Sequence, residues 1–116
     1  MEEGNLWLEI RETMRLLDLA LKEAKERGER MVLTEAAYYT QKANTTFELY
    51  EQGYPATLVQ QAVKGSPEVA AKMSAYHAAQ VEYENAREAR NVYKKRLDTL
   101  REQYAREWGE VGRSDV

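Results

Sequence analysis

The sequence predicts an all-α fold, a long antiparallel helical hairpin with a short helix at the bend. Helix-forming residues dominate the 116-residue chain, which has only two prolines. Strand signals are scarce, because the sequence has no alternating run of β-branched residues and no Asn-Gly turn. Glycine and proline cluster at a few positions that divide the chain into helices. We therefore expect one hairpin domain over residues 1–109 and a polar tail over 110–116.

The first predicted helix covers residues 5–52. Gly53 suits the left-handed position after a helix, and Pro55 disfavours helical geometry at Tyr54. Gly28 lies inside this helix, and we expect the helix to continue there, with or without a local bend. An apolar stripe begins as Ile10, Met14, Leu17, Leu21 and Ala24. It blurs near Gly28 and resumes as Leu33, Ala36 or Ala37, Ala43, Phe47 and Tyr50, a phase change that resembles a stutter.

A short helix is predicted over 55–64 and a second long helix over 67–108. Gly65 ends the short helix, Ser66 is the expected N-cap, and Pro67 is the expected first helical residue. Trp108 and Gly109 are expected to end the last helix. We expect the short helix to cover the hairpin tip, rather than to read DNA as part of a helix-turn-helix. The covering side chains would be Leu58, Val59, Ala62 and Val63.

The second long helix carries two apolar series with seven-residue spacing, typical of a coiled-coil seam. One series is Tyr76, Tyr83, Arg90, Leu97 and Tyr104, and the other is Ala79, Ala86, Tyr93 and Leu100, with Val69 and Met73 extending them. Two helices cover only one stripe each, so the remaining aromatics predict a homodimer with a four-helix arrangement. The dimer would form either along the arms or at the end where Trp7 and Trp108 meet.

Residues for catalysis are scarce. There is no cysteine, and the single histidine, His77, has no acidic residue three or four positions away. A di-metal helical bundle would need a Glu-x-x-His pair, but residue 74 is Ser74. We therefore expect a non-enzymatic protein with no catalytic, cofactor-binding or metal-binding residues. The acidic start and the lack of a long apolar run predict a cytoplasmic protein without a membrane partner.

Tyrosine is the most suggestive residue type, with eight tyrosines and one phenylalanine. Tyrosine suits partly buried interfaces, because its ring packs while its hydroxyl remains hydrated. One interpretation is a loosely packed, hydrated coiled-coil core. The other is a partner-binding surface near the bend, anchored by Tyr50, Tyr54 and Leu58.

A basic stretch in the last helix provides the nucleic-acid alternative. Arg87, Lys94 and Arg101 have seven-residue spacing, with Arg90 adjacent, and such a stripe could follow phosphates. The whole chain has a formal net charge of -3, and the first helix is acidic near its start. We therefore expect pairing within the hairpin to neutralise this stripe.

Two segments resemble a group of small, uncharacterised helical proteins in tailed phages and prophages of Gram-positive bacteria. The first runs from Glu51-Gln52-Gly53-Tyr54-Pro55 to Lys64-Gly65-Ser66-Pro67-Glu68, and the second ends in Arg106-Glu107-Trp108-Gly109. The resemblance covers roughly residues 35–109 and carries over no catalytic residue. It implies a replication or recombination accessory, a host-takeover factor or an inhibitor of a bacterial defence system. The leading hypothesis is a regulatory protein that binds a host or phage protein; the alternatives are a nucleic-acid-associated accessory and a purely structural coiled coil.

Overall fold

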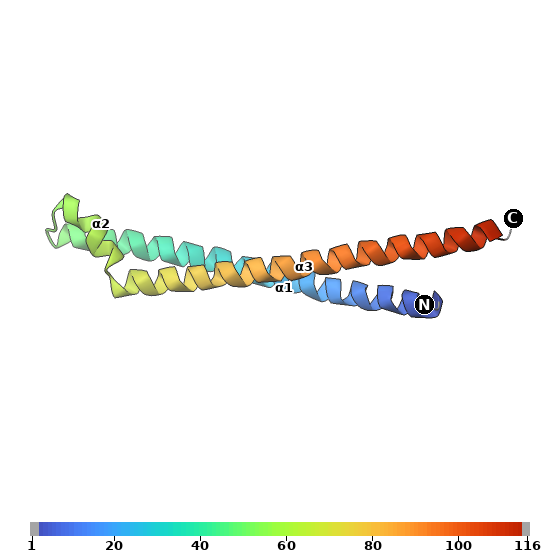
Figure 1. Cartoon of the computed structure of the whole chain (residues 1–116). Helices are drawn as coiled ribbons and strands as arrows, with labels where there is room; N and C mark the ends of the chain where they lie inside the picture. Colours follow the sequence, from blue (N-terminus) through green and yellow to red (C-terminus); the bar gives the residue numbers. More distant parts are fainter. Residues whose placement is uncertain (1–2, 115–116) are drawn as a thin grey trace. The chain divides into compact units, whose positions relative to one another are not determined.

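The structure, a computed structural model, describes residues 3–114. Three helices occupy this range: α1 (Glu3–Glu51), α2 (Ala56–Lys64) and α3 (Pro67–Ser114) (Figure 1). The two long helices pack against each other, so the predicted all-α helical hairpin is confirmed. Contacts between residues divide the chain into two compact units. Unit 1 comprises Met1–Lys25 and Asn85–Val116, and unit 2 comprises Glu26–Glu84.

The core of unit 1 joins the start of α1 to the second half of α3. Leu6 and Ile10 of α1 are buried with Leu97 and Leu100 of α3. Leu17 and Tyr104 pack against this cluster from its edges. Three alanines, Ala20, Ala24 and Ala86, are also buried in this unit.

The core of unit 2 lies where α2 covers the ends of the long helices. Val59 and Val63 of α2 are buried together with Val69 of α3. Tyr38 and Leu49 of α1 pack against this valine cluster. The predicted covering role of α2 is therefore confirmed for Val59 and Val63. It is wrong for Leu58, which is 51% exposed because one residue before Val59 its side chain points about 100° away around this short helix.

The buried stripe of α1 keeps a single seven-residue spacing through Gly28. Its members are Ile10, Leu17, Ala24, Met31, Tyr38 and Thr45, all buried or half-buried. The predicted phase change is wrong, because Leu33 and Phe47 are 71% and 64% exposed and the alanines at 36 and 43 are exposed as well. In unit 1, Met14 and Leu21 are likewise exposed, and Thr13 and Ala20 are buried instead.

A polar residue in the seam explains this error. Thr45 is only 8% exposed, and its hydroxyl accepts a hydrogen bond from Gln41 Nε2 at 3.1 Å. A buried hydroxyl with a partner costs little, whereas an unpartnered one would be expensive. The seam therefore tolerates a threonine where a hydrophobicity pattern indicates a surface position.

The seam predicted for α3 is largely confirmed. Its alanine and leucine positions are buried, namely Ala79, Ala86, Leu97 and Leu100, and Val69 is buried as well. The tyrosines and Arg90 are half-buried, and Met73 is exposed. Tyr76 stacks on Tyr38 of α1 with ring centroids 6.0 Å apart.

The helix ends near the bend follow the glycine and proline signals, but the end of α3 does not. Gly53 has φ 86°, in the left-handed region that favours glycine. At the start of α3, the Ser66 hydroxyl donates to Glu68 Oε2 at 2.9 Å. The predicted stop at Trp108 is wrong, because α3 continues to Ser114. Glycine only weakens a helix by about 1 kcal/mol, and no proline follows Gly109 as Pro55 follows Gly53.

Candidate interaction surfaces

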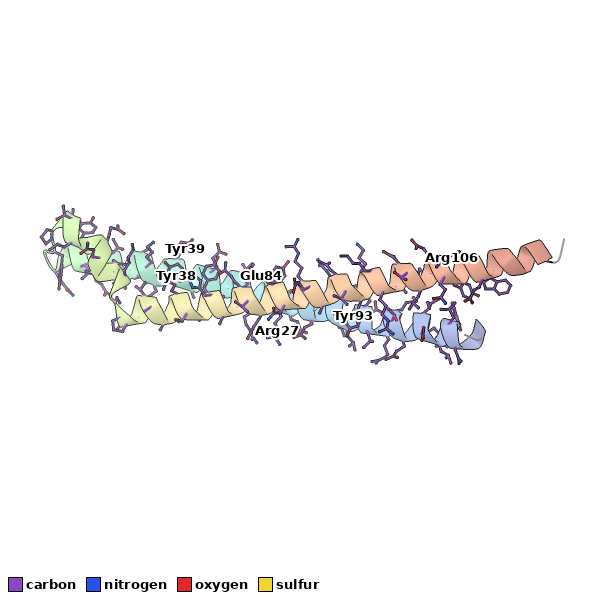
Figure 2. The ribbon with its side chains drawn as sticks, viewed as in Figure 1. Arg27, Tyr38, Tyr39, Glu84, Tyr93 and Arg106 are labelled. Carbon is purple, nitrogen blue, oxygen red and sulfur yellow. The ribbon has the colours of Figure 1, made fainter. Side chains whose placement is uncertain are left out.

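The second half of α1 carries an apolar face that its own unit leaves uncovered. We call it the outer stripe; it consists of Val32, Leu33, Ala36, Tyr39, Ala43 and Phe47, and all six side chains are exposed. Helical geometry places these residues roughly opposite the buried stripe of Met31, Tyr38 and Thr45. Figure 2 labels Tyr38 and Tyr39, neighbouring residues that belong to the two different stripes. This half of α1 is therefore apolar on two sides.

The predicted partner-binding residues lie where α1 ends and α2 begins. Tyr50 is in the last turn of α1, Tyr54 is in the connection, and Leu58 is in the first turn of α2. All three side chains are about half exposed. Tyr50 also lines a shallow hollow together with Tyr39 and Phe47. We call Tyr50, Tyr54 and Leu58 the bend surface.

The backbone of the connection orients the bend surface. The Tyr54 N–H donates to the carbonyl of Leu49 at 3.1 Å, and the Leu58 N–H donates to the carbonyl of Pro55 at 2.9 Å. These bonds hold Tyr54 and Leu58 at the ends of a short, hydrogen-bonded connection. Because the backbone of the connection is already ordered, little backbone entropy would be lost when a partner binds there, which favours recognition.

A groove in unit 1 brings together most of the basic residues named from the sequence. Arg90, Lys94 and Arg101 line it, whereas Arg87 is exposed elsewhere on α3. The remaining lining residues are Leu17, Leu21, Asn91, Leu97 and Asp98. We call this the basic groove; its walls are cationic and aliphatic, with one carboxylate from Asp98.

The expected neutralisation of the basic groove does not occur in the part of the chain that the structure describes. Within residues 3–114, no ion pair to Arg90, Lys94 or Arg101 is present. The reason is positional, because the groove wall contributed by α1 is formed by Leu17 and Leu21 rather than by acidic residues. The three cations therefore face solvent together.

The two tryptophans meet at one tyrosine. Trp7 of α1 lies 6.1 Å from the Tyr104 ring, measured between centroids, and Trp108 of α3 lies 5.9 Å from the same ring. Both tryptophans remain about half exposed. This cluster joins α1 and α3 through aromatic contacts and leaves apolar surface accessible.

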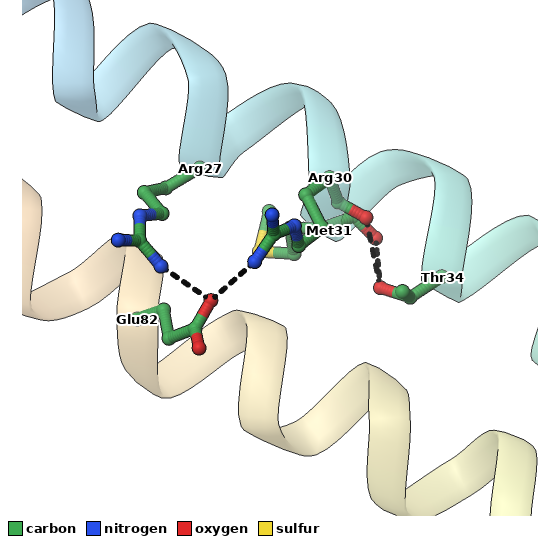
Figure 3. Close-up of polar contacts among 5 residues, drawn as sticks. All are labelled: Arg27, Arg30, Met31, Thr34 and Glu82. Atoms are coloured by element: carbon green, nitrogen blue, oxygen red, sulfur yellow. Dashed lines mark hydrogen bonds and ion pairs between the residues drawn. The ribbon is translucent and has the colours of Figure 1, made fainter.

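A two-arginine clamp joins α1 to α3 in unit 2, and sequence reasoning missed it. The Arg27 and Arg30 guanidinium groups donate to the same Glu82 oxygen, at 2.8 Å and 3.2 Å (Figure 3). The hydrogen bond from Arg27, followed by the charges of both arginines, lowers the pKa of the Glu82 carboxyl. The local pattern could not reveal it, because Glu82 is more than fifty residues from both arginines.

Unit 2 also contains the single histidine and a tyrosine whose pKa is shifted. His77 is exposed on α3, with its ring centroid 5.7 Å from that of the adjacent Tyr76. Partial burial and the nearby Glu35 carboxylate raise the pKa of the Tyr76 phenol. Among the described residues, no three acidic or histidine side chains lie together in a way that could hold a metal ion.

The helices also lack the properties of a membrane span. Over residues 3–114, none combines the length and the apolar character needed to cross a bilayer. The comparisons with known proteins add no assignment: no family model, curated protein or solved structure matches the chain.

Proposed function

We propose that the chain is a non-enzymatic accessory or regulatory protein that acts by binding another protein. The observation that carries this proposal is the bend surface, where Tyr50, Tyr54 and Leu58 are exposed on three successive segments. Leu58 is not a member of the valine core beneath α2, and half of its side chain is open to a partner. Tyrosine is enriched in protein-binding surfaces, because its large ring buries apolar area while its hydroxyl can still form hydrogen bonds.

The biological setting of this proposal is a phage or prophage gene product in the cytoplasm of the infected or lysogenic bacterium. It is supported by the resemblance of the Gly53-Tyr54-Pro55 turn and the terminal Trp108-Gly109 to small phage proteins. The client would be a host or phage protein, and the effect would be host takeover or inhibition of a defence system. The bend surface overlaps the first of these segments, so client binding would use its most distinctive residues.

We further propose that the working form is a homodimer. Support comes from the outer stripe, where apolar side chains such as Leu33 and Phe47 are mostly exposed. Monomeric proteins rarely leave a long apolar stripe in water. A dimer would cover this face and would present two bend surfaces to clients.

The test of client binding is affinity capture from bacterial cells with tagged full-length chain, followed by mass spectrometry. The binding variant is Tyr50→Ala/Tyr54→Ala/Leu58→Ala. The matched control is Leu8→Ala/Val92→Ala, which removes comparably exposed apolar side chains from unit 1. We expect one client to be captured by wild type and control and to be lost from the binding variant, with helical circular dichroism unchanged in all three. A client retained by the binding variant would contradict the proposed surface.

A second candidate function is nucleic-acid binding by a recombination or replication accessory, favoured by the basic groove. Three cations without ion-pair partners in residues 3–114 could contact successive phosphates. The test is a titration of single-stranded and duplex DNA at several salt concentrations. Lys94→Gln/Arg101→Gln should reduce the slope of log affinity against log salt by about one per side chain, and Lys64→Gln/Lys72→Gln should not. Absence of salt-sensitive binding at low salt would exclude this function.

A further inference from the structure

The outer stripe has the spacing of a second coiled-coil seam. Val32, Ala36, Tyr39 and Ala43 follow one another at steps of four, three and four residues, the pattern of paired a and d positions. The face of α1 that packs against α3 has the same step pattern. A helix with two such seams is built to pack against two helices. The occupant of the outer stripe should therefore itself be a helix.

We propose that this occupant is the outer stripe of a second copy, paired antiparallel about a two-fold axis between residues 37 and 38. This proposal deepens the proposed homodimer and assigns its interface and register. In this register, Ala36 packs against Tyr39 of the second copy, and Val32 packs against Ala43 of the second copy. Each layer then joins a small side chain to a larger one, so the stripe is complementary to itself.

The charges beside the stripe select the same register. Glu35 and Lys42 occupy one flank of the stripe, one heptad apart, and both are partly exposed. In an antiparallel pair this flank faces its own equivalent, so Glu35 of each copy lies opposite Lys42 of the other. A shift of one heptad in either direction would instead place Lys42 against Lys42 or Glu35 against Glu35. Such like-charge contacts discriminate against a wrong register.

A parallel pair lacks both kinds of complementarity. Equivalent residues would then meet, so Tyr39 would face Tyr39 and Ala36 would face Ala36, giving crowded and empty layers in alternation. Glu35 would lie near Thr40 of the partner helix rather than near a cation.

Cysteine cross-linking tests orientation and register directly, because the chain contains no cysteine. The full-length variants are Val32→Cys, Ala43→Cys and the double variant. In the proposed dimer, position 32 faces position 43, and each lies roughly 16 Å along the helix from its own equivalent, too far for a disulfide. Mild oxidation should therefore convert the double variant to a discrete covalent dimer and leave both single variants uncross-linked. Cross-linking by either single variant would overturn the antiparallel register, as would a double variant that stays monomeric or forms a ladder of polymers.

A charge exchange provides a second measurement that needs no covalent bond. Lys42→Glu should weaken dimerisation by about tenfold or more in sedimentation velocity, because two attractive contacts become repulsive. Adding Glu35→Lys should restore the wild-type dimer, and Lys72→Glu, an exposed charge on α3, should leave it unchanged. No rescue by the double exchange, or a wild-type monomer, would contradict the proposal. Client capture by the bend surface is a separate measurement, so each proposal can fail while the other holds.

Discussion

Gly28 shows how one tertiary contact can determine a residue that local preference disfavours. Glycine within a helix costs about 1 kcal/mol relative to alanine, yet α1 continues through this position. The structure supplies the reason, because a Cβ at Gly28 would lie 3.2 Å from Cε2 and 3.4 Å from Cδ2 of Tyr83. The missing side chain leaves room for the Tyr83 ring on α3. Gly28 is therefore a packing position within a continuous helix.

Substitution of Gly28 should depend on Tyr83. We expect Gly28→Ala to stabilise the protein by about 1 kcal/mol in a Tyr83→Ala background, where only helix propensity changes. In the wild-type background the gain should be smaller or reversed, because the new methyl group meets the ring. Urea unfolding of wild type, the two single variants and the double variant measures this coupling. Equal gains in the two backgrounds would show that the ring does not constrain position 28.

The Glu82 clamp predicts a defined pH dependence. Its carboxyl has a lowered pKa in the folded protein, so its contribution to stability is present above the ordinary glutamate pKa of about 4.3 and is lost as pH falls through the lowered value. Wild type should therefore be more stable than Glu82→Gln at neutral pH. The difference should shrink as the solution is acidified.

Thermal unfolding of both proteins between neutral and acidic pH measures this difference. Glu84→Gln is the matched control, since Glu84 is an exposed carboxylate two residues further along α3. A stability difference between wild type and Glu82→Gln that stays constant with pH would rule out an ionic origin. Raised salt should also reduce the difference, because the three side chains of the clamp are partly exposed.

At the scale of elements, α2 has one side that packs in the core and another side that is exposed. Val59 and Val63 are fully buried against Val69, and Leu58 is half exposed one residue before Val59. The nine-residue helix can therefore close the core with one side and present Leu58 with the other. This division explains why a position expected to cover the hairpin tip is instead part of the bend surface.

The two faces of α2 should respond differently to alanine substitution. Val59→Ala should lower the free energy of unfolding by about 2 kcal/mol, through lost burial and the cavity left behind. Leu58→Ala should change it by less than about 0.5 kcal/mol, as expected for a surface position. Chemical denaturation followed by circular dichroism compares the two variants. A large loss of stability in Leu58→Ala would place that residue in the core and remove it from the bend surface.

The elements also show how far the sequence could predict the fold. Gly53, Pro55 and the Ser66-Pro67 pair determine the backbone locally, so the bend and the bounds of α2 were predictable. The phase of α1 was not, because an uncovered stripe containing Leu33 and Phe47 is more hydrophobic than the true seam containing Thr45. Hydrophobicity indicates that a face can be buried, but it does not tell which of two faces meets α3.

At the scale of the whole molecule, the sequence predicted which kinds of residue form the candidate surfaces. It did not predict which residues lie together. Exposed tyrosines near the bend followed from an excess of tyrosine over what one narrow seam can hold. The basic groove required the structure, because its aliphatic wall comes from Leu17 and Leu21 of the other long helix. Likewise, the Arg27–Glu82 contact joins residues distant in sequence. Such relations depend on the register between helices, which no local pattern specifies.

We propose above that the exposed side chains of the bend surface bind a protein client. The most direct measurement is a calorimetric titration of the captured client into wild type, the Tyr50→Ala/Tyr54→Ala/Leu58→Ala variant and the Leu8→Ala/Val92→Ala control. We predict that the bend variant loses affinity by about 100-fold or more, as for removal of interface hot spots, while the control binds like wild type. Equal affinity for the bend variant and wild type, or an equal loss in the control, would contradict the account.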